Sequence, residues 1–167
     1  MQDDETLFKQ AALNDDRAAF AQLVKLYRLP AINYITKIIK DDYYAEDVAQ
    51  DVFAKFYFKR KSIYPVPSFQ TYLFKSLKNA AIDWLRNHKK IEELNLANFD
   101  FPIKAQAETY LLEDLKKYLT NEEYTLIVLR FFFDLSFKEI AGVMQITAGN
   151  ARIRYSRLKK KLRRLRK

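Results

Sequence analysis

Apolar residues recur at intervals of three and four along most of the chain, which is the spacing of amphipathic α-helices. In the first third of the sequence this pattern predicts three helices with acidic residues near their starts. They lie at residues 5–13, from Asp15 or Asp16 to about Lys40, and at about 44–60. Pro30 falls within the second helix, where we expect it to kink the helix or to start a new section.

A fourth helix is predicted over residues 69–90, after a segment, SIYPVPS (62–68), whose prolines favour a stiff, ordered loop. One side of this helix is apolar and contains Phe69, Leu73, Leu77, Ala80 and Trp84. The other side is cationic and contains Thr71, Tyr72, Lys75, Lys78, Asn79, Ile82, Arg86 and Lys89. By itself this pattern fits either a solvated surface or a helix that binds a polyanion.

Residues 91–106 have no sustained helical period and contain Pro102, so we interpret them as a linker. The linker would separate a domain at residues 1–90 from a domain at residues 107–167. In the second domain we expect helices at about 107–118, after Thr120 to about Phe133, at 137–144 and from Ala148 onward. The chain has only 2 glycines, and tight turns between strands usually need glycine, so an all-α protein with two small helical domains is predicted.

The second domain contains the pattern of a helix-turn-helix, which is a short helix, a turn of about three residues and a longer basic helix. Ser136 and Glu139 match a capping box at the start of the short helix, as Thr120 and Glu123 do for the preceding one. Thr147 could cap the second helix of the motif. Gln145 lies in the turn, where we expect it to accept a left-handed conformation at a cost of about 1 kcal/mol.

The last helix is basic, with one apolar seam and a polar surface around it. The seam contains Ala151, Tyr155, Leu158, Leu162 and Leu165. Because early residues of such a helix reach base edges in the major groove, Asn150 could pair with adenine, and Arg152 or Arg154 with guanine. Residues further along, such as Arg157 and Lys160, would meet phosphates. The alternative is a basic amphipathic tail that lies on an anionic membrane.

Composition excludes several classes of function. The chain has no cysteine, 1 histidine and no glycine-rich phosphate loop, so we expect neither an enzyme nor a protein with a metal or other cofactor. No apolar run approaches the roughly 18 residues that a membrane span needs, so no stable membrane insertion is expected. The N-terminal residues MQDDETLFKQ are acidic and do not resemble a signal peptide, which favours a cytoplasmic protein.

The net charge of +9 is distributed in alternating blocks. Residues 1–54 have 6 basic and 10 acidic side chains, a net of −4, and residues 55–90 have 9 and 1, a net of +8. Residues 91–139 have 5 and 10, a net of −5, and residues 140–167 have 10 and 0, a net of +10. Two separate cationic blocks suggest two contacts with a polyanion, and the acidic blocks suggest a surface for a protein partner.

Three segments of the chain resemble a bacterial RNA polymerase sigma factor of the extracytoplasmic-function group. AEDVAQDVFAKFY (45–57) is similar to the polymerase-binding helix of that family, and SFQTYLFKSLKNAAIDWLRNHKK (68–90) is similar to its −10-reading helix. Residues 119–165 are similar to its −35-reading domain. The resemblance implies two helical domains on a flexible linker. The first would bind core RNA polymerase and hold the melted −10 strand, and the second would read the −35 duplex.

The resemblance also implies roles for individual residues. The polymerase-binding face would contain Asp47, Gln50 and Asp51. The −10 strand would meet Tyr64, Ser68, Tyr72, Lys75, Lys78, Asn79, Arg86 and Lys89. The −35 duplex would meet Asn150, Arg152, Arg154, Arg157 and Lys160. Core RNA polymerase, promoter DNA and an anti-sigma factor are the implied partners.

The sequence departs from the family pattern at two places in the helix-turn-helix. Gln145 stands where the turn usually has glycine, and AGNARIR (148–154) differs from the commoner VGTVKSR, so the bases that are read stay open. A stand-alone helix-turn-helix regulator that binds duplex operators as a dimer is the main alternative function. It would bind tightly without polymerase and would give residues 69–90 no role with single-stranded DNA.

Overall fold

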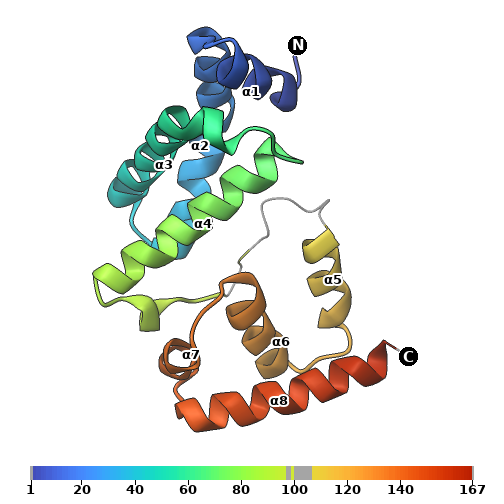
Figure 1. Ribbon diagram of the computed structural model, residues 1–167. Coiled ribbons are helices and arrows are strands. Elements are labelled where there is room, and N and C mark those ends of the chain that lie inside the picture. The colour runs from blue at the N-terminus through green and yellow to red at the C-terminus, as the bar shows by residue number, and fades with distance from the viewer. Residues whose placement is uncertain (1, 97–98, 100–106, 167) are drawn as a thin grey trace. The chain divides into compact units, whose positions relative to one another are not determined.

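The structure is a computed structural model that describes residues 2–96, 99 and 107–166. The chain divides into two compact units, Met1–Trp84 and Leu85–Lys167. All regular elements formed by the described residues are helical, which confirms the predicted all-α class (Figure 1). The division falls inside the fourth helix, a few residues before the boundary predicted at residue 90.

The first four helices follow the predicted order. They are α1 (Asp4–Leu13), α2 (Arg17–Ile39), α3 (Asp42–Ile63) and α4 (Phe69–Asn87). An aspartate precedes each of the first three, and its carboxylate accepts a hydrogen bond from a backbone N–H of the first turn. These caps are Asp3 with Thr6, Asp16 with Ala19, and Asp41 with Tyr44. Of the two aspartates predicted as possible caps of the second helix, Asp16 is the one that caps it.

Pro30 lies inside α2, which continues as one helix to Ile39. The predicted new section at this residue does not occur. Pro30 itself is exposed, whereas Leu23 and Ile35 on either side of it are fully buried in the unit. Packing on both sides of Pro30 therefore keeps the helix continuous, although the proline nitrogen cannot donate the backbone hydrogen bond of an α-helix.

Helix α4 buries a wider face than the helical wheel predicts. Phe74 packs on Tyr34 of α2, with ring centroids 5.3 Å apart, and α3 contacts the same helix through Phe56. A helix with neighbours on more than one side has a narrow exposed stripe. Lys78 and Ile82, which were predicted on the cationic side, are therefore buried, with exposed fractions of 9% and 2%. The predicted exposure of Lys78 is wrong.

The predicted end of α4 is also corrected. The helix ends at Asn87, and Lys89 has a φ of 56°, in the left-handed region. The backbone N–H of Lys89 donates to the carbonyl of Arg86, and that of Lys90 donates to the carbonyl of Leu85 over 2.8 Å. These bonds satisfy carbonyls that a helix end would otherwise leave without partners. Lys89 is thus part of the turn that ends the helix rather than of its cationic face.

Among the described residues, the second unit contains the end of α4, four further helices and two short segments. The helices are α5 (Ala107–Lys116), α6 (Asn121–Ile127), α7 (Phe137–Met144) and α8 (Ala148–Leu165). The short segments are a 3₁₀ turn, η1 (Ile91–Glu93), and a π-helical segment, η2 (Val128–Phe132). Both predicted capping boxes are present, with Thr120 and Glu123 at α6 and with Ser136 and Glu139 at α7.

The helix-turn-helix has the predicted geometry. Gln145 adopts the left-handed conformation, with φ 57° and ψ 47°, and the Thr147 hydroxyl accepts a hydrogen bond from the Asn150 N–H over 3.1 Å. Ala151 is fully buried and Ala141 nearly so, because small side chains allow α7 and α8 to approach closely. Leu165, which was predicted in the buried seam of α8, is 43% exposed.

The segment that was predicted as a linker begins as part of the second unit. Leu94, just after η1, is buried, and a Cβ atom on Gly142 of α7 would lie 2.7 Å from the Glu92 side chain. Phe99 packs on Phe133, with ring centroids 5.4 Å apart. The absence of a periodic pattern therefore did not mean an absence of packing. The rest of the predicted linker, residues 97–98 and 100–106, lies outside the described residues.

An ion pair joins the start of α6 to the C-terminal part of α8. The carboxylate of Glu123 accepts hydrogen bonds from the Lys161 ammonium over 2.8 Å and from the Thr120 backbone N–H over 3.0 Å. These bonds, with Lys161 contributing most, hold the pKa of Glu123 below its ordinary value of 4.5. A lowered pKa means that the folded state favours the ionised carboxylate. The pair therefore stabilises the helix-turn-helix unit when the carboxylate is charged.

We predict that replacing Gln145 by glycine stabilises this unit by about 0.5–1 kcal/mol, because glycine avoids the cost of the left-handed conformation. Hydrogen exchange of the α7 and α8 amides in the full-length chain measures the change. Gln145→Ala is the control, because alanine keeps the strained φ and should give no gain. Equal gains for both variants, or none for glycine, would contradict the account.

We predict that Glu123 makes the stability of the second unit depend on pH. Its contribution is present above the ordinary pKa of 4.5 and is lost as the pH falls through the lower folded-state pKa, because protonation ends the charged pair. The protection factors of the α8 amides, which correct for the intrinsic exchange rate at each pH, should fall over that acidic range in the native chain. The Glu123→Gln variant should lose protection at neutral pH and respond less to acid. Identical acid responses of the two proteins would refute this.

Candidate polymerase and DNA interfaces

The predicted polymerase-binding residues lie together on one exposed face of α3. Asp47, Gln50 and Asp51 are all exposed, whereas Val48 and Val52 on the opposite face are buried. The spacing of i, i+3 and i+4 places the three polar side chains side by side. None of the three has a hydrogen bond or ion pair with another part of the chain that the structure describes. Their hydrogen-bonding capacity is thus free for a partner.

Phe58 extends this face and was not singled out by the sequence. It follows Asp51 and Ala54 at helical spacing, and 82% of its surface is exposed. A ring this exposed at the end of an acidic stripe is a typical anchor residue of a protein interface. The sequence did not reveal it because a helix with several aromatic residues does not show which of them the other helices cover.

A groove of about 280 Å³ lies between α3 and α4. Tyr72 and Asn79, both predicted to meet unpaired bases, line its α4 side, and the Tyr72 ring packs 5.4 Å from the ring of Phe56. Lys55 and Lys59 line its α3 side. The sequence assigned these two lysines no role, although their i, i+4 spacing places them on one face. The groove thus combines an aromatic ring, an amide and two cations, with the carboxylate of Asp83 at its α4 side.

The other residues predicted for the −10 strand are in differing surroundings. Lys75 is exposed, and Tyr64 is half-buried with its ring 6.1 Å from that of Phe8. The Ser68 hydroxyl accepts a hydrogen bond from the Thr71 N–H over 3.2 Å and so caps α4. The structure therefore gives Tyr64 and Ser68 roles in packing and capping, and their predicted capture of a base stays a prediction.

Arg86 makes a bidentate ion pair. Its Nε and Nη2 atoms donate to the carboxylate of Glu139 in α7 over 2.5 and 3.0 Å. Arg86 is the main reason why the pKa of Glu139 lies below its ordinary value, and hydrogen bonds from Ser136 add to the effect. Arg86 would have to exchange this carboxylate for a phosphate in order to contact DNA.

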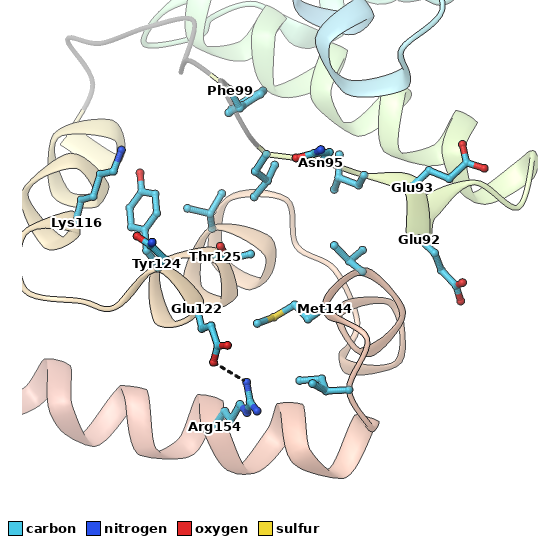
Figure 2. A pocket seen from close by; sticks show the side chains of 16 residues that line it. Glu92, Glu93, Asn95, Phe99, Lys116, Glu122, Tyr124, Thr125, Met144 and Arg154 are labelled. Atoms are coloured by element: carbon cyan, nitrogen blue, oxygen red, sulfur yellow. Dashed lines mark hydrogen bonds and ion pairs between the residues drawn. The ribbon is translucent and has the colours of Figure 1, made fainter.

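The residues predicted for the −35 duplex divide into two groups. Asn150, Arg152, Arg157 and Lys160 are exposed on α8. The Arg152 guanidinium lies 5.7 Å from the centroid of the Phe137 ring. Arg154 is half-buried and turns toward α6, where it forms an ion pair with Glu122 at 3.1 Å (Figure 2).

Figure 2 shows the groove beside this ion pair, within the second unit. The groove has a volume of about 860 Å³ and is lined by residues of the η1 region, α6, α7 and the first turns of α8.

Ile153, on the exposed side of α8, was not predicted from the sequence as a site residue, and 54% of its surface is exposed. An apolar side chain at this position could contact the methyl group of a thymine in the major groove.

The described residues contain no helix that is long and apolar enough to cross a membrane. Within the same residues, no group of histidine and carboxylate side chains is arranged to hold a metal ion.

Comparison with known proteins identifies the family. Residues 23–91 match the family model described as Sigma-70 region 2, and residues 111–162 match the model described as Sigma-70, region 4. The RNA polymerase sigma factor SigV of Bacillus subtilis is 32% identical over 143 residues, which cover 84% of this chain and 81% of SigV. The ECF RNA polymerase sigma factor SigW of the same organism is 25% identical, with 89% of each chain covered.

A solved structure described as CnrH in complex with the cytosolic domain of CnrY matches with 24% identity and a TM-score of 0.43, over 97% of this chain and 96% of that chain. The two family models together span most of the chain. The region 2 match contains the acidic face of α3 and helix α4, and the region 4 match contains the helix-turn-helix. The chain therefore belongs to the extracytoplasmic-function group of the sigma-70 family, whose members direct RNA polymerase to promoters and start transcription there.

Proposed function

We propose that the chain performs this function through three separate surfaces. The acidic face of α3 binds basic residues of the core polymerase, the groove between α3 and α4 holds the melted −10 strand, and the exposed side of α8 reads the −35 duplex. The single observation that supports this most directly is the exposure of Asp47, Gln50 and Asp51 without partners in the described chain. Charged side chains without an internal partner are available to a basic partner surface.

The groove between α3 and α4 suits unpaired bases because it offers two kinds of contact. Tyr72 provides an exposed ring face for stacking, and Asn79 provides an amide for hydrogen bonds. Lys55, Lys59 and Lys75 would meet the phosphates of the strand. We therefore add Lys55 and Lys59 to the predicted residues, and we assign Lys78 a smaller part because it is buried.

The proposal for α8 follows from its exposed side chains. Asn150, Arg152 and Ile153 lie in the first turns, which reach base edges in a helix-turn-helix. Arg157 and Lys160 lie further along and would contact phosphates.

An anti-sigma factor that covers these surfaces would hold the protein inactive, and the acidic and basic faces together offer such a partner complementary charge. No observation favours the stand-alone dimeric regulator.

We predict that the double variant Asp47→Arg, Asp51→Arg loses binding to core polymerase by more than about tenfold, because it places two cations against a basic partner. A pull-down with core enzyme measures the loss, and circular dichroism checks that the helices are kept. Glu113→Arg with Asp114→Arg is the matched control, since it makes the same change of charge on exposed residues of α5. Retained binding of the α3 variant, or equal loss in the control, would contradict the proposal.

We predict that Tyr72→Ala lowers the formation of open promoter complexes by the holoenzyme about tenfold, because one stacked base is worth about 1–3 kcal/mol. Tyr72→Phe keeps the ring and should stay close to the native protein. Permanganate footprinting of unpaired thymines measures the open complex. If Tyr72→Ala opens the promoter as well as Tyr72→Phe does, the groove does not hold a base by stacking.

A further inference from the structure

Arg154 joins two polar residues in a chain of hydrogen bonds. Its Nε atom donates to the side-chain oxygen of Asn150 over 2.9 Å, and its Nη1 atom donates to the carboxylate of Glu122 over 3.1 Å. Asn150 precedes Arg154 by one helical turn on α8, and Glu122 lies in the first turn of α6. Figure 2 shows the Arg154 side chain directed toward Glu122. The guanidinium is therefore engaged within the protein on two of its nitrogen atoms.

This arrangement determines how the Asn150 carboxamide is oriented. A guanidinium has only donors, so the group of Asn150 that faces it must be the amide oxygen. The amide nitrogen then points away from Arg154, and it donates to no acceptor in the part of the chain that the structure describes. Asn150 is exposed on α8, and the exposed residues Ile153 and Arg157 follow it at i+3 and i+7 on the same face. It thus offers its donors to whatever lies against this face.

The bases differ in what they present to such a group. An asparagine that pairs with adenine must accept a hydrogen bond from adenine N6 and donate one to N7. Here the oxygen already accepts from a cation, so the N6 donor would have to share it with the Arg154 guanidinium. Guanine presents two acceptors, N7 and O6, in the major groove and brings no donor to this edge. A carboxamide that presents its nitrogen therefore favours guanine.

We propose that Arg154 is a positioning residue that fixes Asn150 as a hydrogen-bond donor, so that this part of the −35 element is read as guanine rather than adenine. This inference rests on the proposed function, in which α8 reads the −35 duplex. Glu122 assists by holding the other side of the guanidinium. Because 76% of the Glu122 side chain is exposed, its ion pair adds little to stability, and its effect is on orientation.

Transcription by the holoenzyme from a promoter pool with a randomised −35 element tests the proposal. Asn150→Ala identifies the base position that Asn150 reads, because only that preference should disappear. At this position the native protein should prefer guanine to adenine by about tenfold. Arg154→Met should reduce this ratio to about parity, because the carboxamide is then free to turn.

Two further variants make the test specific. Arg157→Met also removes one positive charge from α8, but it should lower transcription from all sequences alike and keep the ratio of guanine to adenine. Asn150→Asp keeps the shape of the side chain but offers only acceptors, so it should lose the preference for guanine and favour cytosine, whose N4 is a donor. This second readout stays available even if Arg154→Met does not fold.

A native preference for adenine at this position would overturn the inference. An unchanged ratio in a folded Arg154→Met variant would overturn it as well, and so would a uniform loss of activity without a change in ratio, since that would indicate a structural role alone. A native holoenzyme whose transcription does not depend on the −35 sequence would contradict the proposed function itself. The two kinds of failure are therefore distinguishable.

Discussion

The structure depends on the burial of one face of each helix that carries excess positive charge. Leu73 and Leu77 hold α4 in the first unit, and Ala151 and Leu158 hold α8 in the second, all with almost no exposed surface. A helix anchored on one side can present cations only on the other, so the charge is concentrated where it can meet DNA. Without this burial the cations would repel one another on a mobile chain and would form no directed surface.

Local backbone interactions fix the orientation of the DNA-reading helix. Ser136 and Thr147 cap the two helices of the motif, and Gln145 makes the turn between them in a left-handed conformation. All three follow from residue types at short spacing, and for this reason the sequence predicted the motif closely. What the sequence could not predict depends on contacts between distant residues: Lys78 is buried because α4 packs against more than one helix, and η1 packs on α7 although it has no periodic pattern.

The interfaces also combine features set by local sequence with features set by contacts between distant residues. The sequence showed that α8 is strongly basic, because residues 140–167 contain 10 cations and no acid. It could not show that the first turn of α6 engages two of these cations, since Glu122 pairs with Arg154 and Glu123 with Lys161. The fold thus divides the basic residues of α8 into those that stabilise the domain through ion pairs and those whose charges are exposed to solvent. Specificity for DNA bases depends on this division as much as on the identity of the residues.

The central claim is that one chain reads a promoter in two states, single-stranded at −10 and duplex at −35, in partnership with core polymerase. Run-off transcription with core enzyme, with and without this chain, measures this most directly on promoters in which either element is scrambled separately. We predict initiation only when the chain is present, with loss of transcripts on scrambling either element. Core enzyme that starts at the same sites with and without the chain would contradict the account.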